Sequence, residues 1–337
     1  MTANKLPTDS TLLLSDEDVR AAFDWDIAIR SLRAAYGGNV SDDMFPPRSM
    51  ARGDGLWLRG LSGIAPDGGV MGVKLIAASM TAGAACYLVP LFDQETTALV
   101  ALLDGNSITG FRTAATSAMA ADRLAPPGAS RVAVIGSGFE ARNHLRALAV
   151  LRPLTEVTVY SPSATSRATF VADVADAHPD VVAVDSAQEA VAHADIVVCA
   201  ARSRDESPTF LGAWLRPGMT VISIGSTLPE QRELDTDAIA RADLIIADMV
   251  TEVAHDTGDM IAAARDGVSF ADGLVALSDV IGGHHPGRTD LEQIVIYKSV
   301  GAAIQDITVS AMCANRAVEL GIGTRLPALI RPVRKGK

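Results

Sequence analysis

A short glycine-containing segment restricts the fold of this 337-residue chain more than any other feature. Residues 135–141 read Ile-Gly-Ser-Gly-Phe-Glu-Ala, between the apolar run 132–135 and a helical stretch that ends at Leu151. This is the pattern G-x-G-x-x-G/A in the strand-to-helix context where it binds a dinucleotide pyrophosphate. Its first glycine permits the tight turn, the second lets the backbone approach a phosphate, and the alanine allows close helix packing. A chance glycine turn between a strand and a helix is the alternative.

The phosphates of such a ligand are held by free backbone N–H groups at the helix N-terminus. The candidate cofactor contacts in this turn are therefore Gly136, Ser137, Gly138, Phe139, Glu140 and Ala141. The chain continues as short apolar runs that alternate with helical stretches such as residues 165–177. Continuous apolar strands are typical of a parallel sheet buried on both faces. The remaining predicted strands are residues 157–160, 181–184, 195–199, 220–224 and 243–247.

The first 125 residues have a different pattern. A hydroxyl cap at Ser15 followed by Asp18 predicts a helix start, and apolar side chains at helical spacing predict a second helix ending at Gly37. Short β-like runs separated mostly by turns then predict a meandering antiparallel sheet. A long alanine-rich helix is expected from a cap near Thr109 to about Leu124. The four β-like runs are residues 56–58, 70–76, 87–92 and 98–103.

Together these patterns predict an α/β protein of two domains, which its length also favours. A break at residues 126–128 marks the boundary, and a helix over 299–320 is expected to return to the first domain. We therefore expect a Rossmann-type, doubly wound parallel sheet at residues 126–304. It would be inserted into a smaller α+β domain made of residues 1–125 and 305–337.

Charge and cysteine content exclude several classes of function. The chain has 29 Lys+Arg and 40 Asp+Glu, a formal net charge of −11 that disfavours nucleic-acid binding. Three widely separated cysteines suggest neither a disulfide framework nor a metal site. Residues 1–10 lack the apolar stretch of a secretion signal, and no apolar run approaches the ~20 residues of a membrane span. We expect a cytoplasmic protein with no metal and no membrane partner.

The residues after the strand 157–160 bear on the choice of nucleotide. An acidic side chain there would bind the ribose 2′-hydroxyl of NAD. The sequence instead provides hydroxyls at Ser161 and Ser163 and a cation at Arg167, which suit the 2′-phosphate of NADP. Arg167 as an ordinary solvated helix residue is the alternative, so NADP is favoured and NAD stays open.

Two cations lie where the predicted fold does not favour them. Lys74 interrupts an apolar strand, where a lysine either extends to the edge or serves an anion or a proton transfer. Arg112 falls in the first turn of the predicted helix 109–124, where the helix dipole disfavours a cation unless an anion shares the site. A salt bridge from Arg112 to Asp104 is the alternative. With Arg48, these cations could bind a carboxylate.

At this point the chain resembles the ornithine cyclodeaminase/mu-crystallin family over nearly its whole length. The order and spacing of the motifs carry the resemblance. They are Pro47-Arg48, Gly72-Val-Lys74, Asp104-Gly-Asn-Ser-Ile-Thr109 with Arg112-Thr-Ala-Ala-Thr-Ser117, the glycine turn, Gly225-Ser-Thr-Leu-Pro-Glu-Gln-Arg-Glu-Leu-Asp235, Gly258-Asp259 and Tyr297-Lys-Ser-Val-Gly301.

The resemblance implies a homodimer that pairs through the smaller domain. It also implies that Arg48, Lys74 and Arg112 hold the carboxylate of a small substrate. Cofactor contacts are implied for Arg112, Thr113 and residues 297–301, which match the family's segment near the nicotinamide. We add residues that follow the predicted strands 195–199 and 220–224. These further candidates are Ala200, Ala201, Gly225, Ser226, Lys298, Ser299 and Gly301.

Two departures from the family pattern narrow the expected activity. Cyclodeaminases have an aspartate that handles the substrate amine at the position of Thr227, and the ketimine reductases have a Ser-His pair where this chain has Ala84-Ala85. The first departure argues against a cyclodeaminase, and the second implies a substrate pocket different from that of the ketimine reductases. The resemblance as a whole implies NAD(P)H-dependent reduction of the C=N bond of a small imino acid, or the equivalent amino-acid dehydrogenase reaction. Lys74 is expected to be the general acid, and Thr227 to orient the substrate nitrogen or a water. A cyclodeaminase-type lyase that recycles bound NAD and a non-catalytic NADP-dependent binding protein are the alternatives.

Overall fold

A computed structural model describes residues 6–66, 68–201, 203 and 207–333. Residues 1–5, part of the segment considered above for a secretion signal, lie outside the described residues. The chain divides into two compact units, unit 1 (residues 1–112 and 302–337) and unit 2 (residues 113–301). The first boundary thus lies inside a long helix rather than after it at residue 125, and the second precedes residue 305.

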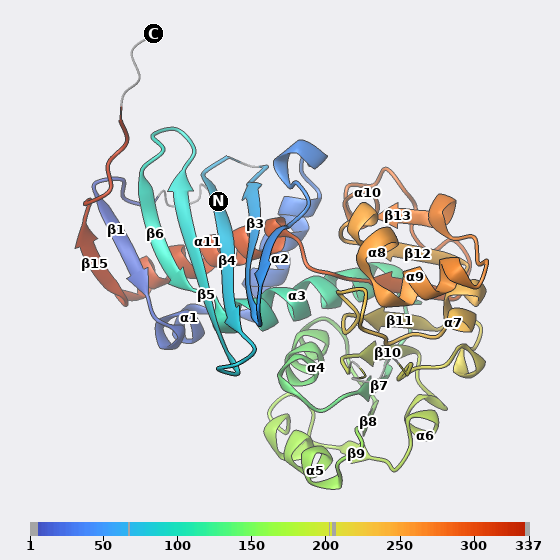
Figure 1. Ribbon diagram of the computed structural model, residues 1–337. Helices are drawn as coiled ribbons and strands as arrows, with labels where there is room; N and C mark the ends of the chain where they lie inside the picture. The colour runs from blue at the N-terminus through green and yellow to red at the C-terminus, as the bar shows by residue number, and fades with distance from the viewer. Residues whose placement is uncertain (1–5, 67, 202, 204–206, 334–337) are drawn as a thin grey trace. The chain divides into compact units, whose positions relative to one another are not determined.

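Unit 1 consists of one sheet and the helices packed on it (Figure 1). In chain order its strands and helices are β1 (Ser10–Leu14), α1 (Asp16–Ala22), α2 (Trp25–Tyr36), β2 (Ser49–Gly53), β3 (Leu56–Ile64), β4 (Val70–Ser79), β5 (Ala84–Asp93), β6 (Leu99–Asp104), the start of α3 (Asn106–Leu124), α11 (Ala303–Leu320) and β15 (Thr324–Pro327).

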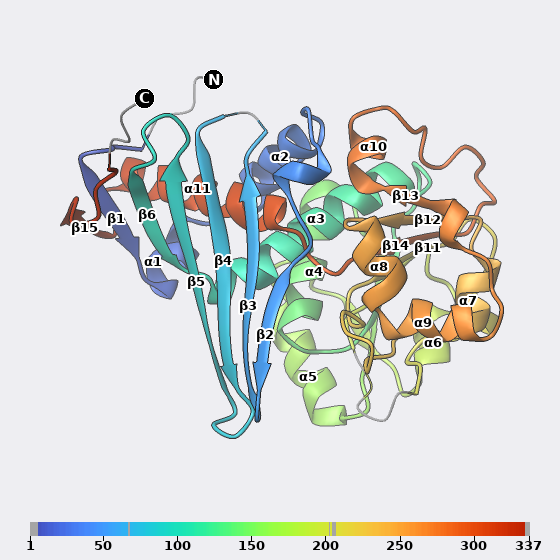
Figure 2. The ribbon, with the colours of Figure 1, turned by 45° about the horizontal axis from the view of Figure 1, so that its top comes forward.

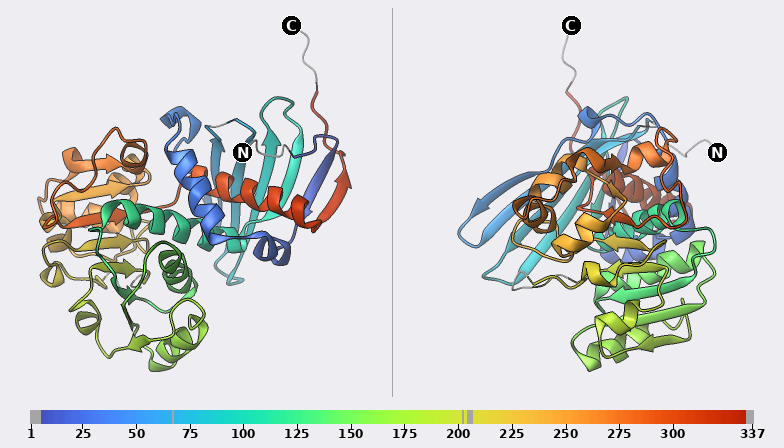
Figure 3. Two further views of the ribbon diagram at one scale, coloured as in Figure 1. Left: turned by 180° about the vertical axis from the view of Figure 1, so that it is seen from behind. Right: turned by 90° about the vertical axis from the view of Figure 1, so that its right-hand side faces the viewer.

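The sheet of unit 1 contains the predicted antiparallel meander and extends it at both edges. Among the described residues its order is β15-β1-β6-β5-β4-β3-β2, with β1 parallel to β6 and the other pairs antiparallel. Figure 2 shows the long strands β2–β5 side by side. One face packs against α11, which lies beside α2 in front of the sheet in the left view of Figure 3. The last helix therefore contributes to the core of unit 1.

Local sequence explains how unit 1 begins. Ser15 and Asp18 form the predicted reciprocal capping box of α1, because the Ser15 hydroxyl accepts from the backbone of Asp18 and the Asp18 carboxylate accepts from that of Ser15. The predicted second helix is α2, which buries Ile29, Leu32 and Tyr36 and ends at Gly37. Its apolar stripe faces the core formed with α11.

Unit 2 is the predicted doubly wound structure. Its strands form a parallel sheet whose order, over the described residues, is β13-β12-β14-β11-β10-β7-β8-β9. The direction of winding reverses between β7 and β10, the position where such sheets bind nucleotides. After the end of α3, its elements are β7 (Arg131–Ile135), α4 (Phe139–Leu151), β8 (Glu156–Tyr160), α5 (Ala164–Asp173), β9 (Val181–Ala183), α6 (Ala187–Val191), β10 (Ile196–Cys199), β11 (Thr220–Ser223), α7 (Thr236–Arg241), β12 (Leu244–Ala247), α8 (Val250–Asp256), α9 (Gly258–Arg265), β13 (Leu274–Ala276), α10 (Leu277–Ile281) and β14 (Val295–Lys298).

Three predicted helix boundaries were wrong. The long helix α3 begins at Asn106 instead of a cap near Thr109, because the Asp104 carboxylate accepts from the Asn106 N–H. Arg112 is therefore in the second turn, and the argument from the helix dipole does not apply to it. The final helix begins at Ala303 rather than at residue 299, because Ala302 is an N-cap in the extended conformation. Likewise α5 ends at Asp173 rather than at residue 177.

The helices of the described part of the chain include none long and apolar enough to cross a membrane.

Candidate functional site

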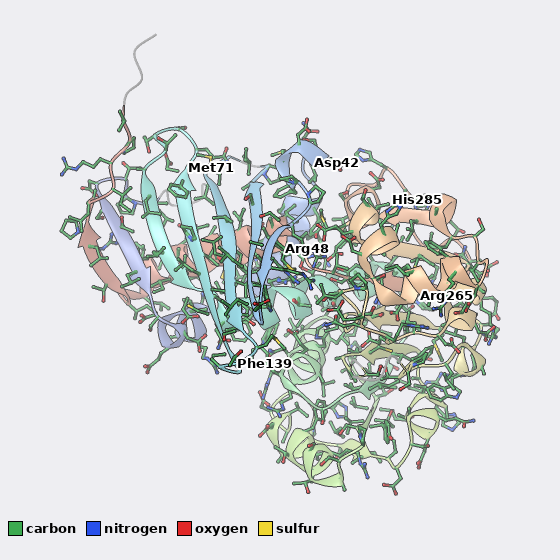
Figure 4. All side chains as sticks on the ribbon, viewed as in Figure 1. Asp42, Arg48, Met71, Phe139, Arg265 and His285 are labelled. Atoms are coloured by element: carbon green, nitrogen blue, oxygen red, sulfur yellow. The ribbon has the colours of Figure 1, made fainter. Side chains whose placement is uncertain are left out.

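The glycine turn has the geometry that a pyrophosphate requires. Gly136 has φ +114°, and a Cβ there would lie 2.6 Å from the carbonyl oxygen of Ala200, so both backbone conformation and space require glycine. A Cβ on Gly138 would meet nothing within 4 Å, which leaves the backbone open to a ligand. Gly138 caps α4 without a side-chain hydrogen bond, and Phe139 beside it is exposed (Figure 4). These residues fit a dinucleotide phosphate.

The side chains after β8 form a connected group. The Ser137 hydroxyl donates to that of Ser161 at 2.9 Å, and the Ser163 hydroxyl caps α5 by accepting from its backbone. Arg167 donates to the Ser161 carbonyl at 2.7 Å and forms an ion pair of 2.5 Å with Asp185. Arg167 is therefore fixed over the end of β8, although Asp185 partly neutralises its charge.

In unit 1, Lys74 and Arg112 meet at a single buried carboxylate. The Lys74 Nζ atom lies 2.7 Å from Asp306 Oδ1, and the Arg112 Nε atom lies 3.0 Å from the same oxygen. The exposed fractions of Lys74, Arg112 and Asp306 are 1%, 6% and 0%. The predicted alternative partner of Arg112, Asp104, is not the one it contacts here. Because two cations share one acid, these three side chains carry a formal charge of +1 that a bound carboxylate would balance.

Two further polar side chains, Gln305 and Tyr36, extend the hydrogen bonds around Arg112. Arg112 Nη1 donates to Gln305 Oε1 at 2.5 Å, and Gln305 Nε2 donates to the Tyr36 hydroxyl at 2.9 Å. We call Lys74, Arg112, Gln305 and Asp306 the Lys74 cluster. Sequence reasoning missed Gln305 and Asp306. A polar pair within the apolar face of the final helix was the signal that could have identified them.

Strand register relates the third predicted cation to this cluster. On the neighbouring strand β3, Leu61 pairs with Lys74. Between β2 and β3, Ser49 pairs with Gly60, so extending this ladder by one residue puts Arg48 opposite Leu61. Arg48 and Lys74 then lie in one row of the sheet, about 10 Å apart at the spacing of neighbouring strands. Figure 4 shows Arg48 beside the sheet. Its side chain is partly buried.

Arg59 is a further cation that the sequence analysis did not single out. It pairs with Ile76 in the same ladder and therefore lies on the same sheet face as Lys74. Its guanidinium carbon lies 5.1 Å from the centre of the Trp57 ring. The positive potential on this face is thus larger than three predicted cations would give.

The environment of Lys74 lowers the pKa of its ammonium to about 8. Burial is the largest cause, and Arg112 acts in the same direction. The nearby Asp306 carboxylate opposes the shift, and Arg59 adds a smaller lowering effect. The ammonium is therefore mostly protonated at neutral pH yet loses its proton far more readily than an ordinary lysine, which suits a general acid.

In unit 2, further predicted residues lie at or just after the ends of β10, β11 and β14. Thr227 donates through its hydroxyl to Gln231 Oε1 at 3.2 Å, and the Ser226 hydroxyl donates to the Gln231 carbonyl. Since the Thr227 proton is used in this way, its oxygen is oriented to accept a hydrogen bond. Ala201 and Gly225, at the ends of β10 and β11, both donate through their backbone to the carboxylate of Glu233, which sequence reasoning missed.

The segment after β14 is fixed by another acid. Asp248 accepts from the Ser299 hydroxyl and from the backbone N–H groups of Val300 and Gly301. Lys298 is fully buried and contacts Asp259 and Ser223, so its ammonium lies inside unit 2.

Thr113 and Ala200 are the other predicted cofactor contacts. Thr113 follows Arg112 in α3 and is buried, and Ala200 contacts the glycine turn through its carbonyl as described above. The described residues include no group of three or more His, Cys, Asp or Glu side chains arranged to hold a metal.

Replacing Asp306 by asparagine is expected to destabilise the protein strongly. The amide keeps the shape of the side chain but removes the negative charge that contacts two buried cations, and breaking a buried ion pair costs about 3–5 kcal/mol in comparable cases. Urea unfolding of Asp306→Asn measures the free energy. Asp26→Asn is the control, since it breaks an exposed ion pair with Arg30 worth under about 1 kcal/mol. Equal stability of the two variants would contradict the assignment.

Comparison with known proteins finds relatives similar in sequence and in fold. A Delta(1)-pyrroline-2-carboxylate reductase of Bacillus cereus is 31% identical over 241 residues, 71% of this chain and 73% of the relative. Ketimine reductase mu-crystallin of Mus musculus is 31% identical over 222 residues, 66% of each chain. The structure of Thermococcus litoralis Delta(1)-pyrroline-2-carboxylate reductase in complex with NADH and L-proline has a TM-score of 0.86 at 26% identity, and covers 93% of this chain and 99% of that one.

Residues 71–321 match the model of the ornithine cyclodeaminase/mu-crystallin family. The resemblance expected from the sequence motifs is thereby confirmed, and the chain belongs to the ornithine cyclodeaminase/mu-crystallin family.

Proposed function

We propose that this protein reduces the C=N bond of a small imino acid with a nicotinamide cofactor, or catalyses the equivalent amino-acid dehydrogenase reaction. The observation that carries the proposal is the Lys74 cluster, in which two buried cations share one carboxylate. A net positive charge in a site of low accessibility favours a small anion of matching shape, and a carboxylate accepts from both lysine and arginine. Relatives named as reductases of pyrroline-2-carboxylate and of ketimines support the same reaction class.

Each residue of unit 1 has a distinct task in this proposal. Arg48 and Arg112 bind the carboxylate of the substrate and fix its orientation. Lys74 hydrogen-bonds the same group and donates a proton to the imine nitrogen, which balances the hydride that the bound cofactor would supply to the imine carbon. Its pKa of about 8 makes it an effective acid near neutrality. Asp306 keeps the Lys74 ammonium in place without occupying all three of its N–H groups.

In unit 2 the glycine turn and the loops after β10, β11 and β14 would hold the cofactor, which supplies the hydride when bound. Thr227 accepts a hydrogen bond from the substrate nitrogen, because its own proton is directed to Gln231. An acceptor here favours a substrate whose nitrogen carries a hydrogen. A cyclodeaminase would need a base at this position, and a threonine hydroxyl is not one.

The finer cofactor preference that we propose is NADP, with NAD as the alternative. The support is the fixed position of Arg167 at the end of β8, beside the hydroxyls of Ser161 and Ser137. A 2′-phosphate would compete with Asp185 for the Arg167 guanidinium, which it can do as the more highly charged group.

We also propose that the protein is a homodimer that pairs through the outer face of the unit 1 sheet. The face opposite α11 presents Leu56, Leu58 and Leu88, of which the first two are at least half exposed. Leu56, Leu58, Ala77 and Cys86 are among the residues that line a hollow of about 690 Å³ on this face. An apolar sheet face of this kind is typical of an interface.

A reducing, cytoplasmic location is part of the proposal, supported by the three cysteines being unpaired.

The activity is tested by supplying NADPH or NADH with 2-oxo acids and either ammonia or methylamine, and with cyclic imino acids. Wild-type protein is expected to oxidise the cofactor, and its kcat is expected to fall as the pH rises above about 8, where Lys74 loses its proton. Lys74→Arg keeps the charge but cannot release a proton, so kcat should fall by about 100-fold or more while cofactor binding persists.

Three results would count against this activity. No turnover of either cofactor across the panel would contradict it, and net redox-neutral conversion of ornithine to proline and ammonia would establish the lyase instead. Cofactor binding with Lys74→Ala leaving every measurable activity unchanged would favour the non-catalytic binding protein.

The nucleotide preference is tested by Arg167→Gln. The dissociation constant for NADPH is expected to rise by about tenfold, the usual scale for a lost charged hydrogen bond, while that for NADH changes little. Asp185→Asn is the matched variant, and it should tighten NADPH by removing the competing carboxylate. Equal weakening of NADPH and NADH in Arg167→Gln would show that Arg167 does not recognise the phosphate.

The dimer is tested by light scattering of Leu58→Asp. A buried charge in the interface should convert particles of twice the chain mass into monomers. Leu291→Asp places the same charge on an exposed leucine of unit 2 and should leave the dimer intact. A wild-type monomer at micromolar concentration would overturn this part of the proposal.

A further inference from the structure

Glu233 holds the ends of two neighbouring strands of unit 2 with one carboxylate. Its Oε1 atom accepts from the backbone N–H of Ala201 at 3.1 Å, just after β10. Its Oε2 atom accepts from the N–H of Gly225 at 2.8 Å and from the Ser223 hydroxyl at 2.6 Å, at the end of β11. The side chain is completely buried. Glu233 thus adds a side-chain connection between two segments that also contact each other through backbone hydrogen bonds, such as that from Ser203 to Arg232.

A buried ion pair continues this network toward β14. Lys298 Nζ lies 2.9 Å from Asp259 Oδ2 and donates to the Ser223 hydroxyl oxygen at the same distance. The other oxygen of Asp259 accepts from the backbone N–H groups of Glu233 and Leu234. The position of Glu233 is therefore fixed from both its backbone and its side chain.

Close backbone packing makes these loops a single assembly with the glycine turn. A Cβ on Gly225 would lie 2.3 Å from Glu233 Oε1, so glycine there is what admits the carboxylate. A Cβ on Gly136 would lie 2.6 Å from the carbonyl oxygen of Ala200, so the glycine turn also packs closely here. Ala200 directly precedes Ala201, whose N–H donates to Glu233. A shift of Ala201 is therefore expected to move the surface on which the phosphate turn rests.

We propose that Glu233, as a carboxylate, is the positioning residue that keeps the loops after β10 and β11 in the conformation that binds the dinucleotide. This inference rests on the proposed binding of a nicotinamide cofactor to unit 2. The loops concerned carry the candidate cofactor contacts Ala200, Ala201, Gly225 and Ser226. Glu233 itself acts through their backbone N–H groups, which a negatively charged acceptor holds more strongly than a neutral one.

Protonation of Glu233 is expected to release this assembly. The three groups that contact its carboxylate oxygens are all donors, so an added proton must reverse or break one of these hydrogen bonds. Burial raises the pKa of Glu233 to about 7, and Asp259 adds to the shift. Lys298, the Ser223 hydroxyl and the Gly225 N–H oppose it.

The remaining neighbours do not alter the direction of this effect. The Cys199 thiol on β10 stays neutral, because burial raises its pKa well above the usual value, and Arg232 lies 3.4 Å from Asp259. Cofactor affinity is therefore expected to increase as the pH rises from 6 to 8 and Glu233 ionises.

Isothermal titration of the full chain with NADP⁺ at pH 6 and at pH 8 tests the proposal. Glu233→Gln removes the charge and presents an NH₂ group to one of the two backbone donors, so it should bind about tenfold more weakly than wild type at pH 8. The 2′-phosphate of the ligand also titrates in this range, but it contributes equally to both proteins. The ratio of Kd at pH 6 to Kd at pH 8 should be several-fold larger for wild type than for Glu233→Gln.

Two further variants separate this role from a general effect on folding. Glu230→Gln makes the same change at an exposed position of the same loop and should behave as wild type. Ser223→Ala removes a donor that stabilises the ionised Glu233, so the pH at which affinity is halved should move upward. This second measurement applies even if Glu233→Gln does not fold.

The possible results discriminate clearly. A Glu233→Gln protein with a lower melting temperature but wild-type Kd and pH dependence would overturn the proposal, because Glu233 would then serve only stability. A flat wild-type profile with no shift in Ser223→Ala would also overturn it. A wild-type protein that binds neither NADP⁺ nor NAD⁺ would overturn the proposed function, and this inference with it.

Discussion

The function proposed for this protein depends on one electrostatic arrangement, in which two buried cations contact the same carboxylate oxygen. Lys74 and Arg112 share Asp306, and the desolvation that this arrangement costs is only partly offset by one carboxylate. A chain could avoid this cost with apolar side chains, so its presence points to a ligand that completes the charge balance. The same arrangement lowers the pKa of Lys74, which joins binding and proton transfer in one side chain.

Chain topology is what makes this cluster possible. Lys74 comes from the middle of the sheet, Arg112 from α3, and Asp306 from a helix that returns to unit 1 after the whole of unit 2. Carboxylates serve a related purpose in unit 2, where Glu233 and Asp248 hold backbone N–H groups at three strand ends. In each unit, then, a buried acid fixes groups that a ligand would contact. These acids bind protein groups rather than substrate.

Local patterns in the sequence were sufficient for most of the elements and for the candidate residues that stand out within a single element. The glycine turn after β7 and the capping box at Ser15 depend on neighbouring residues, and both were predicted correctly. Partners distant in sequence could not be deduced in this way. Asp306 lies 232 residues from Lys74, and Glu233 looks like an ordinary loop acid until its backbone partners are known. The strand β14 was missed because a short apolar run, here Val295 to Tyr297, cannot be assigned to a strand or to a buried helix by periodicity alone.

The central claim is most directly tested by a crystal structure of the protein with NADP⁺ and pyrrole-2-carboxylate, a planar carboxylate that cannot be reduced like an imine. The account predicts that the ligand carboxylate lies within hydrogen-bond distance of Lys74 Nζ and of a guanidinium nitrogen of Arg112 or Arg48. It also predicts that Asp306 keeps its contact with Lys74. A carboxylate bound elsewhere, with the Lys74 cluster closed to it, would contradict the account.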